Sequence, residues 1–205
     1  MKTKKGFILL TLAILVTGFA EGFAVAAEFQ AVSVSGPVTM IRAGKSKVIQ
    51  NGEALQSGDR LTTNGDSRLD IIKAGGWGYR LLQSSDCVIH TVAGKTEIEM
   101  LQGNVIFKII PTKGRNLTVR TPVVVAAVRG TQFWGQVTPS GESHNAIFAV
   151  REGSVKMTVL KSKKTWMLKA GQAMEIHGDE GTAETRAAKP AELEAIGQIA
   201  DLDLA

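Results

Sequence analysis

The sequence predicts an all-β protein: a twisted β-solenoid-like or sandwich-like stack of short strands, followed by one short C-terminal helix. Short apolar or alternating runs fill most of the chain, as expected for strands that bury one face. Glycine, present 22 times, separates nearly all of these runs. A helical spacing of apolar residues occurs only near the C terminus. These three observations together favour many short strands over a mixed fold.

The strand pattern begins near residue 32 and ends near residue 176. The expected strands cover residues 32–41, 69–72, 79–82, 87–92, 96–101, 105–110, 117–133, 146–150, 155–159, 165–168 and 173–176. Asn51-Gly52, Asn64-Gly65 and Ser140-Gly141 mark reversals between runs, because asparagine and glycine tolerate the left-handed backbone of tight turns.

A short motif recurs along the chain. Gly36, Gly103 and Gly153 each begin a pattern of glycine, any residue, valine, any residue and a bulky apolar residue. The valine and the bulky residue of each copy point to one face of a strand. Self-similar β units indicate stacked coils or paired sheets that bury each other's apolar faces. Three copies leave the solenoid and the sandwich both open.

The C-terminal part, residues 179–205, changes in composition. Residues 179–189 are polar and are expected to form a linker, and Pro190 suits a first helical turn. Leu193, Ile196 and Ile199 recur at helical spacing and form one apolar stripe. This stripe either docks on the β body or binds a partner protein.

The first 27 residues have the pattern of an export signal. Lys2, Lys4 and Lys5 precede an apolar stretch over 7–20, and small residues at 25–27 suit cleavage. The stretch is too short to span a bilayer comfortably, so we expect no stable membrane span after cleavage. The expected location is therefore the periplasm or the outside of a bacterial cell, with one β domain over residues 28–178.

Charge and chemistry exclude several classes of function. The full chain carries a formal net charge of +5, and removing the three lysines and one glutamate of the first 27 residues leaves +3. So mild a charge gives no reason to expect a nucleic-acid partner. The three histidines are scattered, and the single cysteine, Cys87, has no ligand-spaced neighbour. We therefore expect no catalytic residues, no metal, no cofactor and no enzymatic activity, with Cys87 as a buried small hydrophobe.

A signature near the middle of the chain carries a family resemblance. Thr121 and Pro122 precede an apolar run, which Arg129, Gly130, Thr131 and Phe133 follow. This pattern resembles the core motif of the FecR domain, and the likeness extends over roughly residues 32–176. The resemblance implies a twisted, solenoid-like all-β fold.

The resemblance also implies what the protein does. Regulatory members of the family join a cytoplasmic anti-sigma segment to a periplasmic sensing portion through one membrane helix. No such segment or internal span is evident in this sequence, so we expect a free periplasmic or secreted module. Its expected role is protein interaction in the cell envelope, in signalling or assembly, with an envelope protein as partner.

The signature itself is expected to maintain the fold. On an uninterrupted strand Arg129 would share a face with Val125 and Phe133, and burying an unpaired guanidinium is costly. Either Gly130 forms a bulge that redirects Arg129, or a partner inside the fold neutralises it.

A glycan- or surface-polymer-binding domain is the alternative function. Trp77 is expected to lie in a turn, because Gly75, Gly76 and Gly78 surround it, and an exposed indole stacks on sugar rings. This alternative requires Trp77 to lie on an accessible surface.

Overall fold

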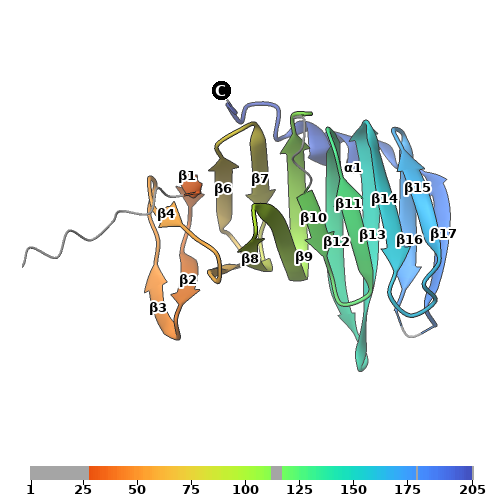
Figure 1. Cartoon of the computed structure of the whole chain (residues 1–205), viewed down its shortest axis with the longest axis horizontal. Helices are drawn as coiled ribbons and strands as arrows, with labels where there is room; N and C mark the ends of the chain where they lie inside the picture. The colour runs from red at the N-terminus through yellow and green to blue at the C-terminus, as the bar shows by residue number, and fades with distance from the viewer. Residues whose placement is uncertain (1–27, 112–116, 179, 205) are drawn as a thin grey trace, which may run out of the picture.

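The protein folds as two β-sheets packed face to face, with one short helix on the outside (Figure 1). The structure is a computed structural model and describes residues 28–111, 117–178 and 180–204. The strands follow one another from the N-terminal to the C-terminal end of an elongated stack. The fold is therefore all-β with one C-terminal helix, as the sequence predicts.

Sheet A contains nine strands in the order that follows, all paired antiparallel. They are β4 (Ala54–Leu55), β1 (Phe29–Ser35), β6 (Arg68–Lys73), β7 (Trp77–Leu81), the second half of β9 (Lys95–Ile109), β12 (Gln132–Ser140), β13 (Ser143–Glu152), β16 (Gln172–His177) and β17 (Thr182–Ala187).

Sheet B shares the long strand β9 with sheet A. Its order is β3 (Lys45–Val48), β2 (Val38–Arg42), β5 (Arg60–Thr63), β8 (Asp86–Val92), the first half of β9, β10 (Leu117–Arg120), β11 (Val124–Val128), β14 (Ser154–Val159) and β15 (Thr165–Lys169). Among the described strand pairs, β9 with β10 is the one parallel pair. Each sheet contributes one apolar face to a common core.

Aromatic rings from three neighbouring strands fill the middle of that core. Tyr79, Phe107 and Phe133 lie opposite one another on β7, β9 and β12. Their rings stack, with centroids 6.0 Å apart for Tyr79 and Phe107 and 4.6 Å apart for Phe107 and Phe133. Because each buried ring removes a large apolar area from water, this stack is a main source of stability.

The recurring glycine motif marks the corners where the chain passes from one sheet to the other. Gly36 lies between β1 and β2, Gly153 between β13 and β14, and Gly103 at the bend of β9. Gly103 has φ of 93°, and a Cβ atom there would lie 2.3 Å from the Cα of Ser85. Only glycine fits such a corner, so the repeat sets where strands change sheets.

Four expectations about the elements need correction. The runs 32–41 and 117–133 are not single strands, because Gly36, the turn at Thr121 and Pro122, and Gly130 divide them. Conversely, 96–101 and 105–110 belong to one strand, β9, which bends at Gly103 without ending. The expected linker 179–189 contains strand β17, since pairing with β16 satisfies its backbone although its side chains are polar.

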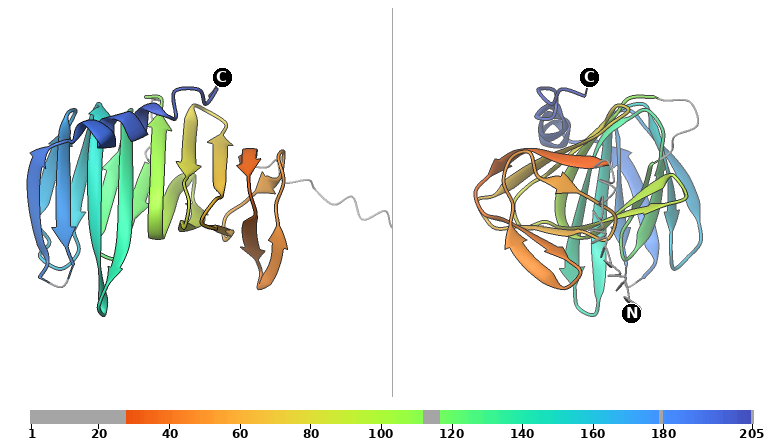
Figure 2. Two further views of the ribbon diagram at one scale, coloured as in Figure 1. Left: turned by 180° about the vertical axis from the view of Figure 1, so that it is seen from behind. Right: turned by 60° about the vertical axis from the view of Figure 1, so that its left-hand side comes forward.

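Helix α1 (Pro190–Gly197) begins at the expected proline and lies on the outer face of sheet A (Figure 2). Residues 188–204, the helix and the segment that follows it, are called the strap below. Ile196 and Ile199 are fully buried against the sheet, and Leu193 is half-buried. The stripe therefore docks on the chain's own sheet, the first of the two expected alternatives, and its binding to a partner stays a prediction.

Candidate protein-interaction surface

The outer face of sheet B holds a depression. It has a volume of about 650 Å³ and lies over β8, β9 and β10. Its lining residues are His90, Val92, Ala93, Lys95, Thr96, Glu97, Glu99, Thr118 and Arg120. Strand pairing brings them together: Glu97 lies opposite His90 on one side and Thr118 on the other, and Glu99 lies opposite Arg120.

One ion pair and one histidine–carboxylate contact form the floor of this depression. Arg120 Nε donates to Glu97 Oε1 at 2.9 Å, and His90 Nε2 lies 3.0 Å from Glu99 Oε2. The bond to Glu97, opposed by some burial, raises the pKa of Arg120, so this side chain stays charged. The side chains of Arg120 and Glu97 are 41% and 30% exposed. Ion pairs this exposed contribute little to the stability of the fold. Arg120 and Glu97 can therefore also form contacts with charged groups of a partner.

Exposed apolar side chains lie at the depression and farther across the same face of sheet B. Val92 at the end of β8 is 74% exposed, and Met167 on β15 is 55% exposed. Ala127 on β11 is also exposed and leads toward Met167 through Lys156 on the strand between them. Exposed apolar side chains close to accessible charges offer a protein partner both apolar and electrostatic contacts.

The FecR-like signature lies at the border between the sheets rather than in the depression. Thr121 is buried, and its hydroxyl oxygen accepts bonds from the backbone N–H groups of Val123 and Val124 at 3.2 and 3.0 Å. Pro122 is exposed in the same turn, where its missing N–H leaves no ladder bond unmade. Thr121 and Pro122 thus shape the entry into β11.

Gly130 resolves the question of the buried arginine. It has φ of +64° and separates β11 from β12, so Val124, Ala126 and Val128 point inward before it and Phe133 after it. Arg129 is exposed. A Cβ atom on Gly130 would lie 2.4 Å from Pro111 Cγ, which leaves no room for a side chain. Arg129 shares the outer face of β11 with half-buried Val125 and exposed Ala127, and the corner at Gly130 turns Thr131 and Phe133 inward to continue the core.

Trp77 is not where glycan binding requires it. It lies within β7 and is only 3% exposed, with Lys73 Nζ 5.0 Å from the centre of its ring. The turn ends at Gly76 and Trp77 already belongs to β7, so the indole is part of the core. The glycan-binding prediction for Trp77 is wrong for this reason.

Chemistry beyond binding has little support in the described residues. Cys87 is buried and unpaired, as expected, and burial raises the pKa of its thiol well above the usual range. No group of three or more histidine, cysteine or acidic side chains within 28–111, 117–178 and 180–204 is placed to hold a metal ion. Within the same residues, no helix is both long and apolar enough to cross a bilayer.

The fold and this surface define a class: an all-β domain whose candidate site is an open sheet face with paired charges. A comparison with known protein families then assigns part of the chain to one of them. The family described as FecR protein matches residues 59–156, and this part of the chain, from β5 into β14, is a FecR domain.

One solved structure supports the fold. The crystal structure of a "putative anti-sigma factor from Parabacteroides distasonis ATCC 8503" at 1.65 Å superimposes with a TM-score of 0.57 and 17% sequence identity. The match covers 68% of this chain and 64% of that chain, less than two thirds of its length. A 2.50 Å structure with the same description gives a TM-score of 0.47 and 18% identity. Similarity at this identity shows the fold alone, and no curated protein matches the sequence.

Sequence reasoning missed His90, Glu97, Glu99 and Arg120 as a site. Glu97 and Glu99 alternate on one strand, a pattern that is typical of a solvated face. Their partners come from segments that precede and follow that strand, one of them through the parallel pairing of β9 with β10. The sequence did contain one signal: polar and apolar residues alternate over 97–99 and again over 118–120, as on two strands that each expose a polar face.

Proposed function

We propose that this chain is an exported, non-enzymatic protein-interaction module of the cell envelope that acts in signalling, and that its protein partner binds the outer face of sheet B. The observation that carries the proposal is the open, charged depression at the centre of the FecR domain. The four side chains of its ion pair and its histidine–carboxylate contact all lie within residues 59–156.

The comparisons support the signalling part of this proposal. A FecR domain and a fold shared with a protein described as an anti-sigma factor both favour a partner that is itself a protein. Direct control of a sigma factor is not proposed, because the match to that protein is confined to 64% of its chain.

Export is the second part of the proposal. The charged, apolar and small-residue regions of 1–27 support it, although these residues lie outside those that the structure describes. N-terminal sequencing of the protein recovered from the cell envelope tests it. We expect a new N terminus near residue 28, and an intact Met1 in the cytoplasmic fraction would contradict export.

The partner is best sought by mild crosslinking in the native envelope, followed by affinity purification and mass spectrometry. Three forms of the tagged chain are compared: the native sequence, Glu99→Arg with Arg120→Glu on the depression, and Glu184→Arg on the exposed polar strand β17. Reversing charges on the depression is expected to remove the partner, whereas Glu184→Arg retains it. Truncation at residue 180 is a poor substitute, because it also removes β17 and uncovers sheet A.

The result that contradicts the proposal is equally specific. If the charge-reversed chain keeps the partner while circular dichroism shows native structure, the outer face of sheet B is not the binding surface. Retention on cell-wall polysaccharide with no protein partner in any of the three forms would overturn the protein-interaction function as a whole.

A further inference from the structure

The strap packs on the outer face of sheet A, and the surface that it covers there is called the groove below. Residues 188–204 run from the end of β17 back across β13, β12 and β9 toward β7, so the C terminus lies over the middle of the stack (Figure 2). This path crosses strands that are far from the strap in sequence. The strap therefore joins the C-terminal end of the stack to its centre.

Three apolar side chains of the strap point into the groove. Ile196 and Ile199 are fully buried and Leu202 is 6% exposed. They pack against Ile106, Ala149 and Ala173, which are completely buried although they lie on the outer face of the sheet. Without the strap these residues and the half-buried Trp134 would form an exposed apolar patch, which soluble proteins reserve for binding.

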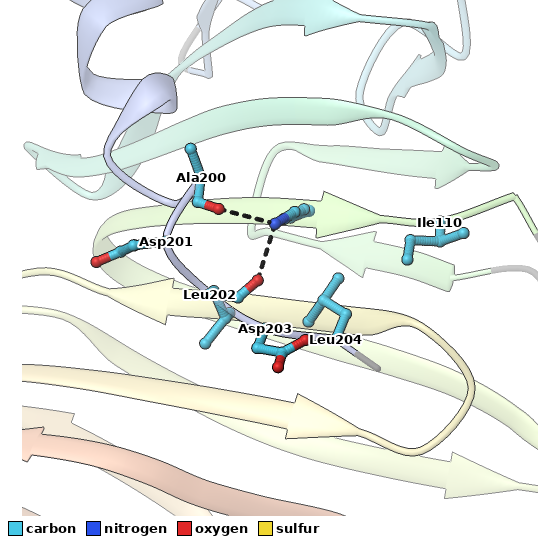
Figure 3. Close-up of a pocket in the computed structure, with 7 residues that line it drawn as sticks. Ile110, Ala200, Asp201, Leu202, Asp203 and Leu204 are labelled. Carbon is cyan, nitrogen blue, oxygen red and sulfur yellow. Dashed lines mark hydrogen bonds between the residues drawn. The ribbon is translucent and has the colours of Figure 1, made fainter.

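The sheet also binds the main chain of the strap. Lys108 Nζ donates to the carbonyl oxygens of Ala200 and Leu202 at 3.1 and 2.8 Å, as the dashed lines in Figure 3 show. Arg80 donates to the carbonyl oxygen of Gln198, and Arg151 to that of Leu193 at 3.4 Å. Every peptide has the same backbone carbonyl groups, so these donors recognise the path of the bound backbone. Recognition of the bound side chains depends on the apolar contacts.

A glycine completes the shape of the groove. Gly78 lies inside β7, where a glycine normally weakens a strand. A Cβ atom at this position would lie 2.5 Å from Cδ2 of Leu202 and 2.5 Å from Cδ2 of Leu204. The bare backbone at Gly78 thus provides the space into which the end of the strap fits.

The strap does not form a stable structure by itself. Its helix has eight residues, includes Gly197 and has no basic residue in its last turn. Helices this short are marginal in water without a surface to pack on. The strap is therefore a separable ligand, and the groove orders it.

We propose that this groove is a peptide-binding site that also accepts the strap of a second copy of the chain, so that two copies pair by exchanging straps. Every copy carries both the groove and the one segment known to fit it, which makes exchange a low-cost route to a pair. The tether gives the copy's own strap an effective concentration of order mM, so exchange dominates only when copies are concentrated or the internal contact is weakened.

This proposal is independent of the function proposed for sheet B, since the two surfaces lie on opposite faces of the sandwich. Exchange can fail while the outer face of sheet B still binds its partner, and the reverse also holds. The two experiments therefore give separate answers.

Complementation between two variants of the full chain tests the exchange. Ile199→Glu disables the strap and leaves the groove intact, and Gly78→Leu fills the groove and leaves the strap intact. We expect each variant alone to sediment with the mass of one chain, and an equimolar mixture to sediment with twice that mass. The matched control is a mixture of Ile199→Glu with Ala127→Leu, a substitution on the exposed face of sheet B. We expect less pairing in this control, because the strap of the Ala127→Leu chain stays in the groove of the same chain.

A mixture that keeps the mass of one chain, while circular dichroism shows both variants folded, overturns the proposal. If Ile199→Glu does not fold, the milder Ile199→Ala chain is titrated with a fluorescent peptide of residues 188–205. We expect this peptide to bind Ile199→Ala about tenfold more tightly than the double variant that also carries Gly78→Leu. Equal binding to the two chains would also overturn it.

Discussion

The outer faces of sheets A and B carry comparable arginine–carboxylate pairs but differ in what covers them. On sheet A, Arg80 binds Asp70 through two bonds of 2.6 and 2.8 Å beneath the strap, and its side chain is 3% exposed. On sheet B, Arg120 binds Glu97 at 2.9 Å with no segment above it among the described residues, and its side chain is 41% exposed. The same kind of ion pair is buried and structural on sheet A, where the strap covers it. On sheet B it is exposed and can contact a partner.

The largest expected difference comes from truncating the acid of each pair. Asp70→Ala leaves the buried guanidinium of Arg80 with only exposed Asp201 and a carbonyl group, and we expect it to cost about 3–5 kcal/mol of unfolding free energy. Glu97→Ala leaves Arg120 partly in water and is expected to cost less than about 1 kcal/mol. Urea unfolding of both variants measures the difference, and equal costs would show that the strap does not shield sheet A.

The apolar contact of the strap gives the next effect. Ile199→Ala removes a fully buried side chain and is expected to cost about 2–4 kcal/mol and to increase the binding of a hydrophobic dye. Val125→Ala, at a half-buried position on the outer face of sheet B, is the control and is expected to cost about 1 kcal/mol or less. A small effect of Ile199→Ala would mean that the strap adds little stability.

The corners shared by both sheets can be tested with two glycines. Gly130→Ala introduces a side chain at φ of +64° and against the ring of Pro111, so we expect a loss of about 2–3 kcal/mol. Gly141→Ala, in a hairpin with φ of +58° and open space around it, is expected to lose only about 1 kcal/mol. Thermal unfolding compares them. If both lose the same amount, the contact with Pro111 does not constrain the corner.

The smallest effect is a pH dependence at the root of the strap. Arg186 donates to both carboxylate oxygens of Glu192 at 2.9 and 2.6 Å and lowers the pKa of that carboxyl below its usual 4.5. Because the folded pKa lies below the unfolded one, the stabilisation is complete above the unfolded value and is lost as pH falls through the folded value. Native protein should therefore melt higher than Glu192→Gln near neutral pH, and the difference should vanish in acid below 4.5. A difference that is constant with pH would contradict this role.

Much of the fold could be predicted from local sequence signals. The glycines at 36, 103 and 153 have positive φ and stand at sheet borders, and Pro190 begins the helix. These features depend on the conformational limits of single residues, so the sequence displays them directly.

Other features depend on partners distant in the chain. Trp77 was expected on the surface because glycines precede it, but the pairing of Gly78 with Lys108 and of Trp77 with Ile109 places the indole in the core. Strand β17 has no apolar alternation and forms because the edge of β16 is available. The candidate surface depends on the parallel pairing of β9 with β10, which no single segment reveals.

The comparison of the two faces is tested most directly by site-specific photo-crosslinking in living cells. One photoreactive residue replaces Thr118, which lines the depression on sheet B. Another replaces Gln30, an exposed position on sheet A that the strap does not cover. We predict one discrete crosslinked protein from position 118 and none from position 30. The same adduct from position 30 alone, with both chains folded and exported, would contradict the assignment of the uncovered face as the binding surface.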